Sequence, residues 1–204
     1  MSVTERNPRD TIRPIRIEDV EHATRVLAHA FEADPVLRFI IPDDADWQRV
    51  SLPWFRSVLR SAVRRESALI DDRGQGVIVW ETPAAGAGLA RQLLSTIRMT
   101  GLLRHNLGRA RLLSDTLRSY RPRRAHWYLA YIGIEPGKQR SGLGQALLDS
   151  LLERADIARM PVYLECSARG NLGFYNQARF HLVDEVTIPT GVNTWPMLRE
   201  PNPA

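Results

Sequence analysis

The sequence predicts one α/β domain (residues 1–204) in which helices flank a mixed β-sheet. Its length suits a single core, and its apolar fraction of 44% and charged fraction of 25% are typical of globular proteins. A strand at 127–134, a glycine-bearing loop, a helix at about 142–158 and a strand at 162–166 form a βαβ unit with parallel strands. Hairpin signals elsewhere predict antiparallel strands, so the sheet should be mixed.

The N-terminal half is predicted to combine a mobile arm, helices and a hairpin. Residues 1–11 have little apolar content, so we expect them to form the arm. Acidic residues at 18–19 open the first helix, since negative charge is favoured at a helix N-terminus, and Pro35 is expected to end it. The other elements expected here are a strand at 12–17, a helix at about 47–65, and a hairpin of 68–71 and 76–82 around the turn 72–75.

Residues 88–120 are predicted to form a helical insertion of two basic stretches that divide near Leu107-Gly108. Arginines lie among leucines there, which favours amphipathic helices packed on the sheet over the alternative, a nucleic-acid-binding surface. The chain should close with a short helix at about 171–177 and two strands at 181–188 and 194–199, with Pro196 at a sheet edge or a break.

Charge and cysteine content narrow the function classes. The net charge is +5, and basic runs at 64–65 and 121–124 can attract a polyanion, but no DNA- or RNA-binding signature accompanies them. The single Cys166 allows no disulfide within the chain, and with five scattered histidines it offers no ligand set for structural zinc. We therefore expect no metal. Cys166 lies in an apolar run, where the alternatives are a small buried hydrophobe and a nucleophile.

The sequence also bears on location. No apolar stretch approaches the ~20 residues that a membrane-spanning helix needs, and the first 16 residues are polar and charged. We expect a cytoplasmic protein with no membrane partner.

Residues 139–145, Gln-Arg-Ser-Gly-Leu-Gly-Gln, lie between the strand and the helix of the βαβ unit. Glycine lets a backbone approach a ligand closely, and the first amides of a helix attract negative charge. We expect this loop to hold phosphates, the alternative being a plain tight turn. It lacks the dinucleotide fingerprint because Leu147 stands where glycine or alanine is needed. It lacks the Walker pattern because Gln145-Ala146 follows the last glycine.

The pattern Gln/Arg-x-x-Gly-x-Gly/Ala resembles the pyrophosphate-binding motif of the GNAT N-acetyltransferase superfamily. Residues 162–167 and Asn171-Leu172-Gly173-Phe174-Tyr175 resemble that superfamily's next motif, at the right distance. Three short sequence patterns are similar to those of the puromycin N-acetyltransferase group: Leu-Glu-x-Ser, Asn-Leu-x-Phe-Tyr and Thr-Trp-x-Met-x-Arg-x-Pro. The stretch from Ala28 to Pro35 is similar as well. The resemblance covers most of the chain. It implies a GNAT-type sheet splayed between the strands 127–134 and 162–166, which admits acetyl-coenzyme A.

The resemblance implies how this cosubstrate would lie. The backbone of the strand before the loop would contact its pantetheine arm, and the loop amides would hold its pyrophosphate. Asn171 is either a further contact to the arm or a plain helix N-cap. The implied cofactor-binding residues are Ile132, Gly133, Ile134, Gln139, Arg140, Ser141, Gly142, Leu143, Gly144, Gln145 and Asn171.

Two residues are implied as catalytic. Tyr175 matches the tyrosine that protonates the departing thiolate in many relatives, and a neutral phenol can donate that proton, although a tyrosine that only packs is the alternative. Glu165 is the first candidate for the base that deprotonates the amine, the alternative being a carboxylate paired with an arginine. Glu81 is the second candidate, and a water chain would leave no trace in the sequence. Aromatic residues that line either an acceptor pocket or the core are Phe31, Trp80, Trp127 and Tyr128.

The sequence departs from the family at two places. Arg179-Phe180 stands where relatives usually carry Gly-Phe, which puts the exit from the tyrosine-bearing helix in doubt. Arg140-Ser141 stands where many relatives carry Gly-Lys or Gly-Arg, which should not weaken phosphate binding.

The activity implied is direct transfer of an acetyl group from acetyl-coenzyme A to a primary amine of a small molecule, through a ternary complex, so Cys166 has no covalent role. The enzymatic alternative is acetylation of a protein N-terminus or lysine. A non-catalytic module that binds acetyl-coenzyme A and regulates another process is the rival from a different class, and a nucleic-acid-binding protein is the third interpretation. A homodimer is left open.

Overall fold

The computed structural model describes residues 11–83, 106–189 and 191–202. These residues form an eight-stranded sheet in the order β1-β2-β3-β4-β5-β8-β6, with β7 also paired to β8. The pair β4–β5 is parallel and the other described pairs are antiparallel. The strands are β1 (Ile12–Pro14), β2 (Ala68–Asp71), β3 (Gly76–Glu81), β4 (Trp127–Ile134), β5 (Val162–Cys166), β6 (His181–Leu182), β7 (Val186–Thr187) and β8 (Asn193–Arg199).

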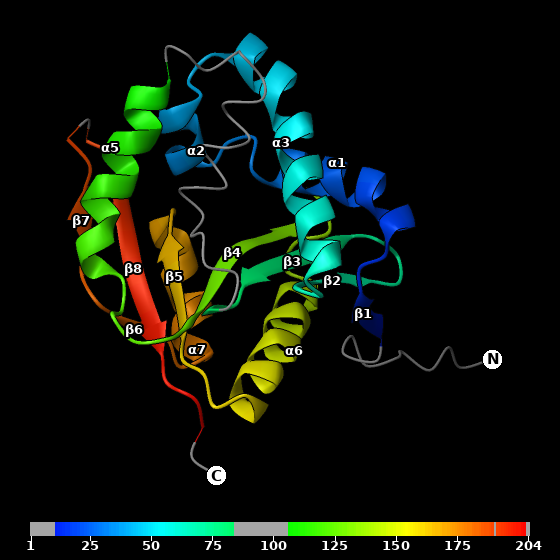
Figure 1. Cartoon of the computed structure of the whole chain (residues 1–204). Coiled ribbons are helices and arrows are strands. Elements are labelled where there is room, and N and C mark those ends of the chain that lie inside the picture. The colour runs from blue at the N-terminus through cyan, green and yellow to red at the C-terminus, as the bar shows by residue number, and fades with distance from the viewer. Residues whose placement is uncertain (1–10, 84–105, 190, 203–204) are drawn as a thin grey trace.

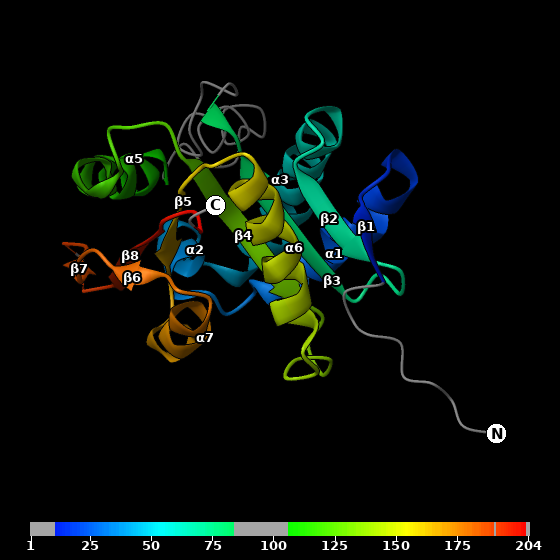
Figure 2. The same ribbon diagram turned by 90° about the horizontal axis from the view of Figure 1, so that it is seen from below.

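Helices cover both faces of the sheet (Figures 1 and 2). α6 lies across one face, over β2 to β4, whereas α1 packs on β4 and on α3 at the other face. The described helices are α1 (Val20–Ala30), α2 (Pro35–Ile40), α3 (Asp44–Arg64), α5 (Leu107–Leu117), α6 (Leu143–Ile157) and α7 (Leu172–Gln177), with short 3-10 helices at Ile17–Asp19, Arg118–Tyr120 and Arg169–Asn171.

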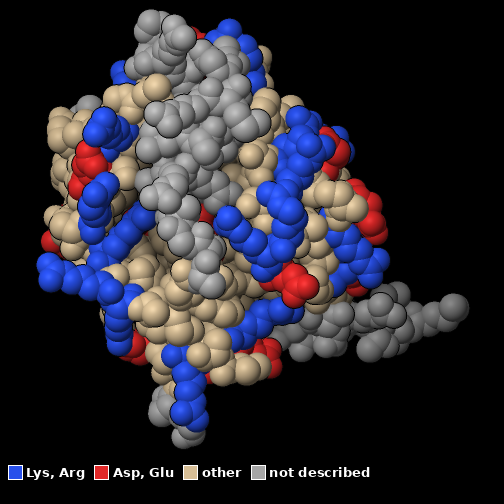
Figure 3. Space-filling view, viewed as in Figure 1, with Lys and Arg blue, Asp and Glu red and all other residues tan. Residues whose placement is uncertain are grey.

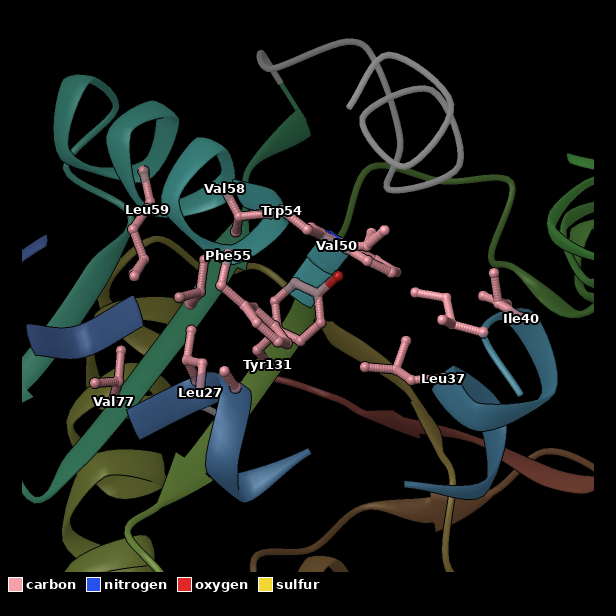
Figure 4. Close-up of a cluster of buried hydrophobic side chains, with 14 of the residues drawn as sticks. Leu27, Leu37, Ile40, Val50, Trp54, Phe55, Val58, Leu59, Val77 and Tyr131 are labelled. Carbon is pink, nitrogen blue, oxygen red and sulfur yellow. The ribbon is translucent and has the colours of Figure 1, made fainter. Parts of the chain in front are cut away.

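Each face of the sheet has its own hydrophobic core. The core under α1 and α3 surrounds Tyr131 of β4, which lies beside Phe55 (Figure 4). The Tyr131 ring meets Phe55 at 5.3 Å and Phe31 at 5.5 Å between centroids, both edge-on. Such edge-to-face contacts add to the gain from burial. On the α6 side, Trp80 and Trp127 stack at 5.9 Å beside the buried leucines of α6. The two cores fix β4 from both sides.

The hairpin, the two parallel strands and three of the helices agree with the sequence prediction. The hairpin of β2 and β3 is confirmed, and β4 and β5 have the predicted bounds. The helices α3, α6 and α7 lie within three residues of the predicted limits. The mixed α/β class with a sheet between helices is therefore confirmed.

The first strand and the arm differ from the prediction. β1 ends at Pro14, three residues early, because the amide of Arg16 donates to the Asp19 carboxylate at 2.8 Å and the chain enters a 3-10 helix. The predicted arm includes Thr11, whose carbonyl accepts the amide of Asp72 at 2.8 Å, so this residue is tied to the turn after β2. Residues 1–10 lie outside the described residues.

The prediction that Pro35 ends the first helix is wrong. α1 ends at Ala30, and Pro35 is the first residue of α2, which was not predicted. Proline suits the first position of a helix because its missing N–H would have no partner there. Asp34 caps α2, since its Oδ1 accepts the amides of Val36 at 3.0 Å and Leu37 at 2.9 Å.

The end of the chain also differs from the prediction. The expected strand at 181–188 is two short strands, β6 and β7, and both pair with β8. Pro196 does not lie at an edge, because β8 has β5 on its other side. The break lies instead in the partner, where the amide of Val183 donates to the Pro196 carbonyl at 2.8 Å and β6 stops.

Of the predicted helical insertion, residues 84–105 lie outside the described residues. The second basic stretch is α5, which buries Ala110, Leu113 and Leu117 and exposes its arginines. α5 is therefore amphipathic, and its main contacts among the described elements are with α2 and the 3-10 helix Arg118–Tyr120. The packing of a helical pair on the sheet stays a prediction. None of the helices described is long and apolar enough to cross a membrane.

Candidate active site

The parallel strands β4 and β5 diverge soon after they meet. They pair only at Trp127–Val162 and Tyr128–Tyr163, and beyond these positions β5 continues beside β8 alone. Figure 1 shows the two strands spreading apart. The β5-facing backbone groups of β4 beyond Tyr128 therefore have no strand partner in the described part of the chain. Such groups need other hydrogen-bond partners, so this edge can bind a ligand.

A cavity of about 890 Å³ occupies this divergence. Its volume lies in the ~300–1,000 Å³ range of small-molecule sites. β4 contributes residues 129–134, and the end of β5 with the two residues after it contributes residues 164–168. The connection between α1 and α2, the loop before α6, and α7 complete its walls.

The loop before α6 turns through three left-handed residues, the first of which is Gly137 with φ +84°. Gly142 has φ +82° and is the N-cap of α6, and Arg140 has φ +60°. A Cβ on Gly142 would meet no described atom within 4 Å, so the space beside it is open. Left-handed residues next to right-handed ones turn consecutive amides toward one anion, and the start of α6 adds its dipole. The loop can therefore hold phosphate groups.

Most of the predicted cofactor residues line one cavity. Two do not: Ser141 donates its hydroxyl to the Lys138 carbonyl at 2.8 Å, and Leu143 is buried in the α6 core. Asn171 is at the N-cap position of α7 without a capping hydrogen bond from its side chain, so its amide can serve a ligand. The predicted residues that line the cavity are Ile132, Gly133, Ile134, Gln139, Arg140, Gly142, Gly144, Gln145 and Asn171.

The two departures from the family pattern, at Arg140 and Arg179, share one backbone feature. Each arginine has a positive φ, +60° for Arg140 and +66° for Arg179, where relatives usually carry glycine. The Phe180 amide still donates to the Tyr175 carbonyl at 3.1 Å, a common way to close a helix. The chain therefore leaves α7 through an ordinary helix-closing turn, at a cost of about 1 kcal/mol per strained residue.

Tyr175 lies in the cavity wall on α7 and is almost fully buried. Its ring packs edge-on against Phe174 and Phe180, at 5.0 and 5.8 Å between centroids. Burial, and to a smaller degree the neighbouring Cys166 and Asp34, raise the pKa of its hydroxyl above the ordinary value. The phenol therefore stays protonated at neutral pH and can donate a proton.

Glu165 also reaches the cavity, but its carboxylate is already engaged. It accepts hydrogen bonds from Arg121 at 3.0 and 3.4 Å, from Tyr128 at 2.5 Å and from Tyr163 at 3.3 Å. Only 8% of its side chain is exposed. A guanidinium and two phenols thus occupy the oxygens of this carboxylate, which favours the arginine-paired alternative.

Glu81 occupies a separate place. It lines a small cavity of about 10 Å³ beside α3, roughly the space for one water molecule. Ala130 borders both this cavity and the large one. Burial raises the pKa of Glu81 to about 7, and Arg65 and Arg121 partly oppose this.

Asp34 and Ser167 were missed by the sequence argument. Both line the large cavity, and the Ser167 hydroxyl donates to Oδ2 of Asp34, which links the start of α2 to the end of β5. Burial raises the pKa of the Asp34 carboxyl, while Ser167 and two backbone amides lower it. The available signal was Asp-Pro, an N-cap followed by a helix-opening proline, but it indicates a helix start and nothing about Ser167.

The remaining candidates, Cys166 and four aromatic residues, differ in whether they can take part in the chemistry or line the cavity. Burial raises the pKa of the Cys166 thiol to about 11, so it is a poor nucleophile at neutral pH. Phe31 lines the cavity, whereas Trp80 and Trp127 pack in the α6 core. Tyr128 is buried and bonded to Glu165.

Charged side chains gather on the face shown in Figure 3, where Lys and Arg lie over α5 and α3 with Asp and Glu between them. Asp115 of α5 forms ion pairs with Arg111 at 3.9 Å and with Arg118 at 3.5 Å. These exposed pairs are weak individually, and they leave the face mixed in sign.

Known proteins with similar sequences or structures include N-acetyltransferases and other acetyltransferases. No protein-family model matches the chain. An uncharacterized N-acetyltransferase of Schizosaccharomyces pombe is 24% identical over 92% of this chain and 82% of its own length. A crystal structure of histone acetyltransferase HPA2 and related acetyltransferase from Corynebacterium glutamicum has a TM-score of 0.67 at 20% identity, covering 95% of this chain and 97% of its own. Arylalkylamine N-acetyltransferase 2 of Aedes aegypti has a TM-score of 0.64 at 12% identity, covering 94% and 98%.

These relatives have the fold that the resemblance implied. The chain has the GNAT acetyltransferase fold, with the mostly antiparallel sheet between helices. The names of its relatives support the predicted enzyme class, an acyl-coenzyme A-dependent acetyltransferase. They name different acceptors, a histone and an arylalkylamine, so they do not choose between protein and small-molecule amines.

Proposed function

We propose that this GNAT-fold enzyme transfers the acetyl group of acetyl-coenzyme A to a primary amine of a small molecule, by direct attack within a ternary complex. The observation that carries the proposal is the cavity between β4 and β5. It runs along the unpaired edge of β4 and is bordered both by the phosphate-holding loop and by the phenol of Tyr175.

The residues present fit an acyl-coenzyme A. The amides at the start of α6, with Gln139 and Arg140 beside them, would hold the pyrophosphate. The unpaired backbone at 132–134 would bond the pantetheine arm, with Asn171 as a further donor. Acetyl-coenzyme A supplies the activated acetyl group when it is bound.

Tyr175 is proposed as the acid of the reaction. The reaction breaks a C–S bond, and a sulfur that gains a proton leaves more easily. A phenol that burial keeps protonated can provide that proton from the cavity wall. Cys166 is given no covalent role, because its buried thiol is protonated at neutral pH.

A small-molecule amine is the acceptor that the similarity to the puromycin N-acetyltransferase group implies, and an arylalkylamine acceptor on the same fold supports it. Acetylation of a protein amine remains the second candidate, favoured by a histone acetyltransferase structure with the same fold. A panel of free primary amines and acceptor peptides, followed by thiol release, separates the two.

The first test is calorimetric titration of the protein with acetyl-coenzyme A. Gly142→Asp places a carboxylate at the proposed phosphate site and a side chain at φ +82°. Gly191→Asp is the matched control, because Gly191 has φ +87° in open space and does not line the cavity. Saturable binding by the native chain and by Gly191→Asp, lost in Gly142→Asp, is the expected result. A folded native chain that fails to bind acetyl-coenzyme A refutes the proposal.

Tyr175→Phe tests the acid. It keeps the ring and its packing but removes the proton, so kcat should fall by about 10²-fold or more while acetyl-coenzyme A still binds. Unchanged turnover by this variant would mean that the sulfur leaves without help from Tyr175.

A further inference from the structure

The proposed reaction needs a base, and the two carboxylates expected from the sequence are poorly suited to that role. Glu165 is held by Arg121, Tyr128 and Tyr163. Glu81 lies in its own small cavity, on the far side of Ala130 from the large one. A third carboxylate, Asp34, lines the large cavity itself, together with Tyr175.

The two oxygens of Asp34 have separate tasks. Oδ1 accepts both amides at the start of α2, which is the structural task of an N-cap. Oδ2 accepts only the hydroxyl of Ser167 among the described residues. A carboxylate oxygen has room for a second donor, so Oδ2 can accept another proton while the cap stays intact.

Among the described residues, no cation compensates the carboxylate of Asp34. The ionisable side chains that interact with it electrostatically are Tyr131 from β4, Cys166 from β5 and Tyr175 from α7. Burial raises the pKa of all three, so they are uncharged near neutral pH. Burial also raises the pKa of Asp34, which makes it a stronger proton acceptor than an exposed aspartate.

We propose that Asp34 is the general base of the acetyl transfer, and that Ser167 is a positioning residue that aims Oδ2 into the cavity. The proposal rests on the proposed function and assigns to Asp34 the role that the sequence suggested for Glu165. Two observations support it. Asp34 lines the same cavity as Tyr175, and the hydroxyl of Ser167, just after β5, donates a hydrogen bond to its Oδ2.

The proton balance closes with these two residues. The acceptor reacts as the free amine, its ammonium proton having passed to solvent. Asp34 Oδ2 accepts the proton that the nitrogen loses as the N–C bond forms, and Tyr175 gives its proton to sulfur as the C–S bond breaks. The proton on Asp34 then returns to the Tyr175 oxygen through solvent, so one amine and one thioester become one amide and one thiol.

Asp34→Asn separates catalysis from capping. Asparagine caps helices about as well as aspartate, and its remaining oxygen can accept the same two amides. Its amide group can donate to Ser167, whose hydroxyl can also accept. A purely structural Asp34 therefore predicts a variant close to the native enzyme. A catalytic Asp34 predicts a kcat lower by about 10²-fold or more, with acetyl-coenzyme A affinity within threefold.

Ser167→Ala gives a second readout that a structural role would not move. The Ser167 hydrogen bond lowers the pKa of Asp34, so its removal raises that pKa further. The acidic limb of the kcat/KM profile should therefore shift to higher pH in Ser167→Ala and vanish in Asp34→Asn. Asp34→Glu should recover part of the lost kcat, because it restores a carboxylate.

The experiment follows thiol release from acetyl-coenzyme A with a panel of primary amines, puromycin and 2-phenylethylamine among them, alongside calorimetry with acetyl-coenzyme A. A native chain that binds acetyl-coenzyme A but acetylates no amine overturns the proposed function. An active native enzyme with an equally active Asp34→Asn variant, or with an acidic limb unmoved by Ser167→Ala, overturns only the assignment of the base. Loss of kcat in Asp34→Asn, with the shifted limb in Ser167→Ala, supports it.

Discussion

Replacing Glu165 by glutamine should lower the free energy of unfolding of this protein without abolishing its acetyltransferase activity. The carboxylate and the Arg121 guanidinium form an ion pair at 3.0 Å, with side-chain exposures of 8% and 24%. Breaking a buried pair by removing one charge costs about 3–5 kcal/mol. Glutamine keeps one acceptor oxygen and Arg121 keeps some contact with water, so we expect a loss of about 2–4 kcal/mol.

This loss is measured by urea denaturation followed by circular dichroism, and by the melting temperature. A chain of this size loses about 2–4 °C per kcal/mol, so Glu165→Gln should melt about 5–15 °C below the native protein. Adding Arg121→Met removes the unpaired guanidinium and should recover at least half of the loss. Glu200→Gln is the control, since the Arg124–Glu200 pair is more than half exposed and worth about 0.5 kcal/mol or less.

The turnover of the same variant decides between the two interpretations of Glu165. Assayed well below its melting temperature, Glu165→Gln should keep at least a tenth of native kcat. A variant as stable as the native protein but about 10²-fold slower would refute the reasoning, because that outcome belongs to a base and not to a structural ion pair.

Three further predictions follow from backbone strain and shifted pKa values. Glu81 has a folded pKa of about 7, above its ordinary 4.5, so the native state binds more protons than the unfolded state between these values. The free energy of unfolding of the native protein should therefore fall as pH rises from about 5 to 8. At pH 8 the Glu81→Gln variant should be about 2 kcal/mol more stable than the native protein, measured by urea titration. Arg179→Gly relieves a φ of +66° and should raise the free energy of unfolding by about 0.5–1 kcal/mol, whereas a loss would show that the Arg179–Asn202 hydrogen bond matters more. Cys166, with a pKa of about 11, should react with iodoacetamide at pH 8 about 10²-fold more slowly than free cysteine.

Local patterns predicted those parts of the fold whose causes are local. The hairpin of β2 and β3 follows from strand formers around an Asp-Arg-Gly turn, and α6 from leucines at four-residue spacing. The first helix was placed wrongly because Pro35 can either stop a helix or begin one. The choice depends on Asp34, whose side chain caps α2. The splitting of β6 and β7 opposite Pro196 depends on which strands surround β8, and no local pattern carries that information.

The candidate site shows the same division. The loop at 139–145 and Tyr175 belong to contiguous motifs, so the sequence indicates them directly. The partners of Glu165 do not: Arg121 is 44 residues away along the chain, and only the folded sheet brings Tyr128 beside it. Asp34 and Ser167 are 133 residues apart. A carboxylate's suitability as a base depends on such distant partners. The resemblance ranks Glu165 first because some relatives place a catalytic glutamate on this strand, and that motif carries no information about the partners of Glu165.

The opening of the site itself comes from one residue in β4. Val79 faces Tyr131 and Trp80 faces Leu129 in the β3–β4 register, so Ala130 is an extra residue on β4. Such a bulge bends its strand and increases the local twist. Pairing between β4 and β5 stops at Tyr128, two residues before Ala130, while β5 stays paired with β8 as far as Cys166. The bulge thus turns β4 away from β5 at the point where the cavity begins, and it leaves Ala130 between the cavity of Glu81 and that of Asp34 and Tyr175. An alanine inside a run of strand formers gives no sign of this in the sequence, although the geometry of the whole site depends on it.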